Sequence, residues 1–431
     1  MTTGERELVR ASSQSPRRHC TRRSTAPGAP RPSDLLASFF AAAICALLLA
    51  AGAAIASTVT GLDWLHWTAV HLALLGGVSQ LVLGAGQFFS CAFLATDPPS
   101  RRLIGAQLLA WNAGTALVVV GVPTATTPLV NAGGCLLAVG LVLFAAGLRG
   151  MQRRSLQRAR WALRWYQASA ACLALGGLFG ILLARDARWP HGSLLGVHLA
   201  LTLGGWIGTA IVGTLHTFFA SLTGTTLRHP RLQGPTFILW LLGVCELALG
   251  AAFAADAVVA SGWLTLVLAA ALLEINLLAS LREATAPLAL PARLIVLAQA
   301  FLPAGLLLAM AATLHTGAAA PFVGQARPAL AALLLLGWIG LTVAGSLLHL
   351  LAILARVRNF APPMPPARPT RDRALTAAAG VAIVALALSH AAGLGPLTTP
   401  ASAVLAAIAG LLAIRILTLA LLAVRAPRRS A

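Results

Sequence analysis

The sequence predicts an all-α polytopic membrane protein with twelve transmembrane helices in a pseudo-threefold arrangement of three groups of four. Of its 431 residues, 58% are hydrophobic and only 10% are charged, whereas a soluble domain needs about 25% charged residues to cover its surface. Twelve apolar stretches approach or exceed the roughly 20 residues that cross the hydrocarbon core. Similar local sequence also recurs in every fourth stretch, which favours three related units.

The predicted spans follow one another through short connections with turn-forming residues, such as DPP at 97–99 and VPTATTP at 122–128. An Arg-, Ser- and Pro-rich stretch at 1–33 is predicted to be a disordered, basic cytoplasmic tail. The membrane domain then covers 34–425, and 426–431 form a C-terminal cytoplasmic tail. The twelve spans are predicted at 35–57, 66–95, 103–122, 128–149, 163–184, 191–222, 235–255, 262–281, 293–313, 328–354, 374–393 and 401–424.

The arginines predict the orientation in the membrane. All 31 basic residues are Arg, and 27 of them fall on one predicted side. Only Arg185, Arg188 and Arg327 fall on the other side, and Arg415 lies inside the last span. The positive-inside rule then places both termini in the cytoplasm and the chain in the inner (plasma) membrane. Because orientation explains the net charge of +20, we expect the lipid bilayer and no nucleic acid as a partner.

Three spans carry the repeated sequence. Residues 70–94 read VHLALLGGVSQLVLGAGQFFSCAFL, residues 197–222 read VHLALTLGGWIGTAIVGTLHTFFASL, and residues 333–354 read LLLLGWIGLTVAGSLLHLLAIL. The repeat predicts units at about 34–150, 160–282 and 292–425, with the second, sixth and tenth spans facing a shared interior. Their glycines allow close helix–helix approach. The alternative is that apolar, Gly-rich helices resemble one another by chance.

Histidines within these spans are the first candidate ligands. His71 and His198 are predicted near the outer end of the membrane, and His216 and His349 near the inner end. Eighteen residues of helix span about 27 Å, so one metal cannot bridge His198 and His216. We therefore expect two separate layers, each able to bind a cofactor. The alternative for the deeper pair is a hydrogen bond to a backbone carbonyl one turn away.

A wider outer layer is also predicted, because His315 and His390 close the ninth and eleventh spans on the outer face. A neutral imidazole is a good ligand for copper or heme iron, and two facing imidazoles can hold a heme from both sides. Polar residues within a bilayer are costly and usually functional. The predicted metal ligands are His71, His198, His315 and His390, although a His at an interface often faces only water.

Ionisable residues also lie within the predicted spans. Glu274 with Asn276 can serve a proton path, and Glu246 can support a histidine ligand. The alternative is that Glu246 and Glu274 pair with each other or with Arg415.

Twelve spans in three groups of four, with inward histidines on the second, sixth and tenth spans, resemble subunit I of the heme–copper oxidase superfamily. The texts around His71 and His198 are most similar to NnrS-type membrane proteins and to the membrane domain of actinobacterial copper oxidase (nitrite reductase-like) proteins. This resemblance implies that His71 binds heme b. Three departures, however, make standard oxygen reduction unlikely: Leu330 stands where a histidine is expected, the seventh span has no His, and the only tyrosine is Tyr166 in the fifth span.

The sequence therefore predicts an integral membrane protein that binds heme, copper or both, in electron transfer or in nitric oxide or copper handling. If it is an enzyme, it is an oxidoreductase. It has no soluble domain, so its redox partner is expected to be a cupredoxin, a cytochrome or a quinone. The alternatives are a cofactor-free transporter and an assembly subunit, although a transporter usually shows two six-helix halves.

Overall fold

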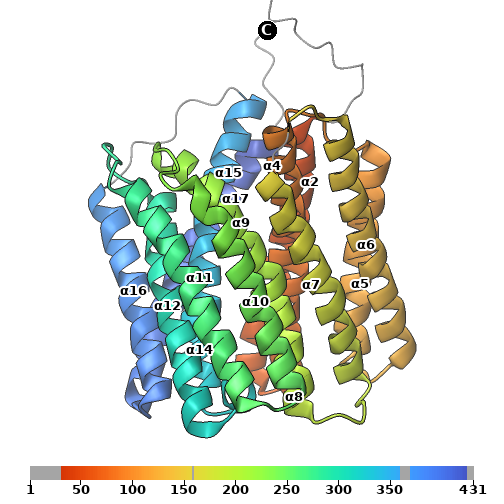
Figure 1. The fold of residues 1–431 in the computed structure, drawn as a ribbon, viewed down its shortest axis with the longest axis vertical. Coiled ribbons are helices and arrows are strands. Elements are labelled where there is room, and N and C mark those ends of the chain that lie inside the picture. Colours follow the sequence, from red (N-terminus) through yellow and green to blue (C-terminus); the bar gives the residue numbers. More distant parts are fainter. Residues whose placement is uncertain (1–30, 158–159, 360–368, 425–431) are drawn as a thin grey trace, which may run out of the picture.

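The computed structural model describes residues 31–157, 160–359 and 369–424, and all regular elements in these ranges are helices (Figure 1). Twelve of the described helical spans are long and apolar enough to cross a membrane, which confirms the predicted fold class. The first helix begins at Pro32, inside the predicted N-terminal tail. The remainder of that tail and the predicted C-terminal tail lie outside the described residues.

The spans alternate in direction between two faces. We call the face where the first span begins the arginine-rich face, and the other the opposite face. The first span is α2 (Pro32–Thr60), the second is α3 (Asp63–His71), η1 (Leu72–Val78) and α4 (Ser79–Leu94), and the third and fourth are α5 (Arg101–Gly121) and α6 (Thr127–Arg154). The fifth span is α7 (Arg160–Ala184), and the sixth is α8 (His191–Leu199), η2 (Ala200–Gly208) and α9 (Thr209–Thr223). The seventh span is η3 (Pro230–Leu232) with α10 (Gln233–Ala252), and the eighth is α11 (Asp256–Leu281). The ninth is α12 (Leu290–Thr316), the short α13 (Ala320–Val323) follows, and the tenth is α14 (Arg327–Leu330), η4 (Ala331–Gly340) and α15 (Leu341–Asn359). The last two are α16 (Pro369–Ala391), and η5 (Gly395–Leu397) with α17 (Thr398–Val424).

The second, sixth and tenth spans each contain a π-helical stretch, η1, η2 and η4. These stretches were not predicted from the sequence. π-Helical turns are rare and are frequent at functional sites. Each stretch begins within two residues of the same repeat position: directly after His71, two residues after His198 and directly after Leu330. The shared irregularity supports the predicted repeat, and it also supports Leu330 as the third-repeat equivalent of His198.

Tryptophans bond the backbone of two of these π stretches. The indole N–H of Trp111 on α5 donates to the carbonyl of Leu75 in η1 at 3.1 Å. The indole N–H of Trp240 on α10 donates to the carbonyl of Gly204 in η2, also at 3.1 Å. The two donors lie on the helices that follow the second and sixth spans, so the bonds are equivalent in the first two repeats. Carbonyls in a membrane need such partners because no water reaches them.

Close contacts at glycines are a second feature that the first two repeats share. A Cβ on Gly114 of α5 would lie 2.9 Å from the carbonyl oxygen of Gly133 on α6. A Cβ on Gly243 of α10 would lie 3.0 Å from the carbonyl oxygen of Gly262 on α11. In both hairpins the backbones touch directly, which only glycine permits. The first two repeats therefore share their hairpin packing as well as their π stretches.

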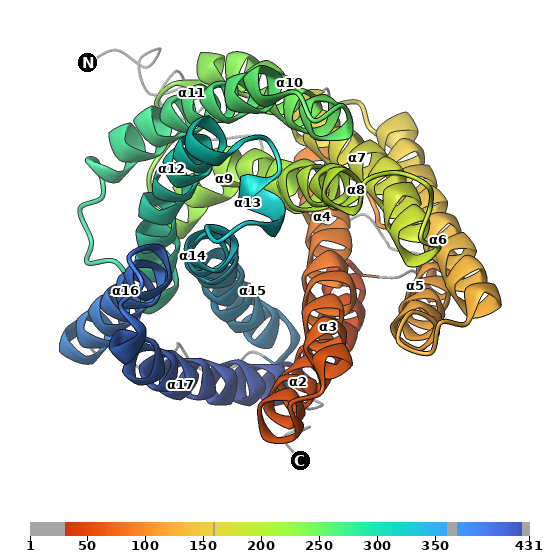
Figure 2. The ribbon, with the colours of Figure 1, turned by 90° about the horizontal axis from the view of Figure 1, so that it is seen from below.

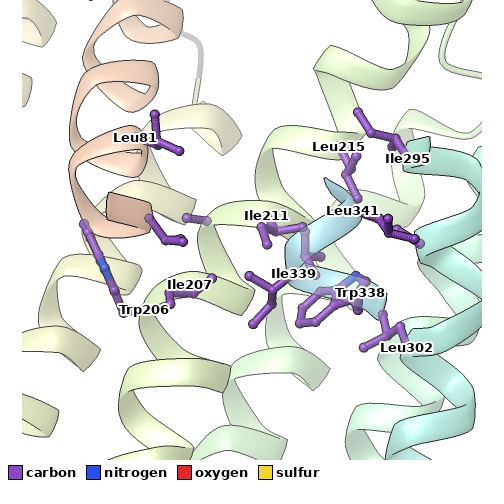
Figure 3. Close-up of a cluster of buried hydrophobic side chains, with 14 of the residues drawn as sticks. Leu81, Trp206, Ile207, Ile211, Leu215, Ile295, Leu302, Trp338, Ile339 and Leu341 are labelled. Carbon is purple, nitrogen blue, oxygen red and sulfur yellow. The ribbon is translucent and has the colours of Figure 1, made fainter. Parts of the chain in front are cut away.

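The three irregular spans meet in the interior of the bundle, as predicted. Viewed from below, α9 and α15 lie within a ring that includes α10, α11, α16, α17 and α2 (Figure 2). The indole N–H of Trp206 in η2 donates to the hydroxyl of Ser79 at 2.8 Å, which joins the sixth span to the second. Phe218 on α9 contacts both Phe89 on α4 and His349 on α15. Figure 3 shows the apolar side chains, including Trp206 and Trp338, that fill this centre.

Candidate functional site

The candidate site is a pair of imidazoles, His71 and His198, near the opposite face. His71 ends α3 and stacks on Trp67, one turn earlier, with ring centroids 3.8 Å apart and an interplanar angle of 22°. Its Nδ1 lies 2.9 Å from the carbonyl oxygen of Trp67. The spacing of four residues places the two rings on the same side of the helix, so the sequence carried this signal although we did not use it.

His198 is held by the neighbouring helix α7. Its Nδ1 lies 2.9 Å from the carbonyl oxygen of Gly176. A Cβ on Gly180, one turn further along α7, would lie 3.0 Å from Cε1 of His198. Gly180 thus leaves the space that the imidazole occupies, and a side chain at 180 would push the ring by a few tenths of an ångström.

Both imidazoles therefore share one hydrogen-bonding state. A backbone carbonyl only accepts, so Nδ1 carries the proton in His71 and in His198, and the lone pair is on Nε2. A neutral imidazole whose Nδ1–H is held by a backbone carbonyl, with Nε2 available, is the arrangement of a metal-ligating histidine. The same bonds also satisfy a histidine with a purely structural role.

The deeper histidines do not form the second shared layer that we predicted. His216 is fully buried and its Nδ1 lies 3.3 Å from Nδ2 of Asn276 on α11. His349 instead packs edge-on against Phe218, with ring centroids 5.4 Å apart. Phe218 is two residues after His216, so their side chains point about 200° apart around α9. The contacts of the two histidines thus lie on different sides of α9.

Asn276 holds a loop of the chain against α11. Its side chain accepts from the backbone N–H of His229 at 3.0 Å and donates to the carbonyl of the same residue at 3.2 Å. Together with the contact to His216, these bonds hold the loop after the sixth span against α11. Nε2 of His216 is buried and has no hydrogen-bond partner among the described residues.

The remaining predicted ligands, His315 and His390, are exposed at the opposite face. His315 lines a hollow of about 490 Å³ together with Asp256 and Thr313. Within residues 31–157, 160–359 and 369–424, no three His, Cys, Asp or Glu side chains form a group that could hold a metal ion. The four predicted metal ligands are therefore not assembled into one centre, and the outer pair stands by itself.

The predicted pairing of the intramembrane charges is wrong. Arg415 on α17 pairs with Asp372 on α16, with 3.3 Å between NH1 and Oδ1. Glu246 accepts a hydrogen bond from the hydroxyl of Thr265 at 2.8 Å, and Oε1 of Glu274 is buried without a partner in the described part of the chain. The sequence misled us because Asp372 lies at the start of α16, and we did not count it among the membrane-embedded residues.

No protein-family model matches the chain. A comparison with curated proteins found no match either.

Proposed function

We propose that this integral membrane protein binds copper, or heme b, through His71 and His198, and serves electron transfer or nitric oxide or copper handling. One observation carries the proposal. In both histidines a backbone carbonyl oxygen lies 2.9 Å from Nδ1, and each histidine stands within two residues of the start of a π stretch, in the same half of the bundle. Two imidazoles of the same tautomer, each with its lone pair on Nε2, are suitable ligands for a metal ion.

Copper fits these residues better than heme. Imidazole nitrogens suit copper, and a small ion needs no large space between its ligands. One face of each ring is already covered, by Trp67 in His71 and by the backbone of α7 at Gly180 in His198. A heme would need room for a flat macrocycle between the imidazoles, and the central cavity described below is lined by neither histidine. Bound copper would supply one-electron redox chemistry.

The protein's own residues would hold and insulate the ion. The carbonyls of Trp67 and Gly176 keep Nδ1 protonated and aim Nε2, and η1 and η2 begin within two residues of the ligands. The surrounding spans are apolar and exclude water. The electron would be exchanged with a cupredoxin, a cytochrome or a quinone. We further propose a multi-pass protein of the plasma membrane with both termini in the cytoplasm, from the arginine distribution.

The test is metal binding by the purified, detergent-solubilised full chain. The protein is loaded with Cu(I), and bound copper is measured by mass spectrometry and by competition with a chromogenic Cu(I) chelator. We expect His71→Ala and His198→Ala to lose the copper that the wild type retains. His315→Ala is the matched control, because that residue is exposed and apart from the pair. Gly180→Ala should weaken binding, because its Cβ would lie 3.0 Å from Cε1 of His198 and would push the ring of a ligand.

The outcomes separate the candidates. A reduced-minus-oxidised alpha band that disappears in His71→Ala would favour heme over copper. Copper binding that is unchanged in both histidine variants would overturn the proposal. A colourless protein that retains no copper would favour a cofactor-free transporter or an assembly subunit.

A further inference from the structure

A cavity of about 80 Å³ lies at the centre of the bundle, where the three repeats meet. Its walls come from α2, α4, α7, α9 and α15, on the arginine-rich side of the π stretches. Most of the wall is apolar, with side chains such as Leu81, Ala85 and Phe218. None of the lining residues is a histidine or carries a charge. The cavity is therefore separate from the histidine pair, and its use does not depend on a metal.

One hydroxyl in the wall lacks a partner. Thr342 follows η4, lines the cavity and is only 4% exposed, yet its Oγ1 has no hydrogen bond within the described structure. The hydroxyls after the other two π stretches are satisfied. Ser79 donates to the carbonyl of Leu74 at 2.9 Å, and Thr209 donates to the carbonyl of Gly204 at 3.3 Å, both five residues back. Thr342, which stands one residue further from its π stretch than Ser79 and Thr209 do from theirs, has no such bond.

A second hydroxyl group offers an acceptor. Tyr166 on α7 lies 2.8 Å from the hydroxyl of Thr214, and both residues line the cavity. Thr214 already donates its proton to the carbonyl of Ala210 at 2.7 Å. Tyr166 must therefore be the donor to Thr214, which leaves the lone pairs of the phenol oxygen free. Ser346, one turn after Thr342, also faces this space.

We propose that the cavity binds a small, uncharged, largely apolar molecule that accepts a hydrogen bond from Thr342. A buried hydroxyl without a partner is costly because it has lost its hydrogen bonds to water, and a ligand with one acceptor oxygen removes that cost. An engineered cavity of about 150 Å³ binds benzene, so this cavity fits a smaller molecule, of the size of a short-chain alcohol. An ion is excluded because the apolar wall provides nothing to replace its hydration.

The test uses ethanol that carries a photoreactive diazirine, a probe with fewer heavy atoms than benzene, with the purified full chain and peptide mass spectrometry. We expect adducts on the cavity wall, with excess unlabelled butanol suppressing them. Thr342→Val keeps the shape and removes the hydroxyl, so labelling at subsaturating alcohol should fall by about two- to tenfold, the worth of one hydrogen bond. Ala85→Leu adds three carbon atoms to the wall and should reduce labelling there at least tenfold.

Two matched controls lie outside the cavity. Ala92→Leu changes an exposed position on the same helix as Ala85, and Thr418→Val removes an exposed hydroxyl on α17. Both should label the cavity wall as the wild type does. The proposal would be overturned if the adducts were spread over lipid-facing residues. It would also be overturned if Thr342→Val labelled the wall as strongly as the wild type and butanol did not compete. If Ala85→Leu aggregates on size exclusion, the labelling of Thr342→Val and the competition by butanol decide the test without it. Loss of copper binding leaves all of these results unchanged.

Discussion

Gly205→Ala tests the packing of η2 against α7. A Cβ on Gly205 would lie 2.6 Å from Cβ of Cys172 and 3.0 Å from its Sγ, whereas ordinary contact begins at 3.4 Å. The Cys172 Cβ cannot rotate away because the backbone fixes it. The two helices would have to separate locally by about 0.8 Å, the difference between 2.6 and 3.4 Å. Overpacking of this kind costs about 1–3 kcal/mol.

The neighbouring Gly204 provides the control. A Cβ at that position meets only a methyl of Val244, at 3.3 Å, and that side chain can adjust. Alanine lowers the entropy of the unfolded chain similarly at both positions, so this contribution cancels in the comparison. We therefore expect the free energy of unfolding, from reversible SDS titration in mixed micelles, to be about 1–3 kcal/mol lower in Gly205→Ala than in Gly204→Ala. Adding Cys172→Gly to Gly205→Ala should restore part of the loss. Equal stability of the two alanine variants would refute the packing described here.

Three further predictions concern polar contacts. Trp240→Phe removes an indole N–H that bonds the π stretch η2, whereas Trp338→Phe removes an indole whose Nε1 has no partner among the described residues. In SDS titration, Trp240→Phe should therefore lower the free energy of unfolding by about 0.6–1.7 kcal/mol more than Trp338→Phe does. Arg415→Met should destabilise more than Asp372→Asn, because it leaves a buried carboxylate unpaired while the Arg415 side chain is 44% exposed. The opposite order in SDS titration would contradict this ion pair. Asn276→Ala should speed amide hydrogen exchange in the loop that its side chain holds, with exchange elsewhere in the sixth span unchanged.

Apolar length was enough to predict the twelve spans, because each needs about 20 residues of any apolar kind. The predicted start at 66 for the second span was too late only because Asp63 and Trp64 begin the helix at the membrane surface. The repeat was visible through the paired glycines and the text around Trp206. Such signals depend on residue type, which a sequence shows directly.

The π stretches and the partner of each histidine could not be predicted. A π turn has the same apolar and Gly-rich composition as an α turn, so η2 reads as a continuous helix. Depth along a span follows from counting residues, and His216 lies in the half of its span nearer the arginine-rich face. Which neighbour a side chain meets depends on rotation about the helix axis, and each π stretch changes that rotation. For this reason Asn276, and not His349, is the partner of His216.

The π stretches uncouple the two halves of each central span. In an uninterrupted α-helix, inserting or deleting one residue turns everything beyond it by about 100°. A π stretch can absorb such a change by shortening or extending, as the unequal bounds of η1, η2 and η4 illustrate. The half that carries His71 or His198 can therefore keep its orientation while the half around the central cavity is re-aimed. Related sequences should accordingly tolerate single-residue insertions and deletions in these three stretches. The two halves of each central span should then be able to vary in sequence separately.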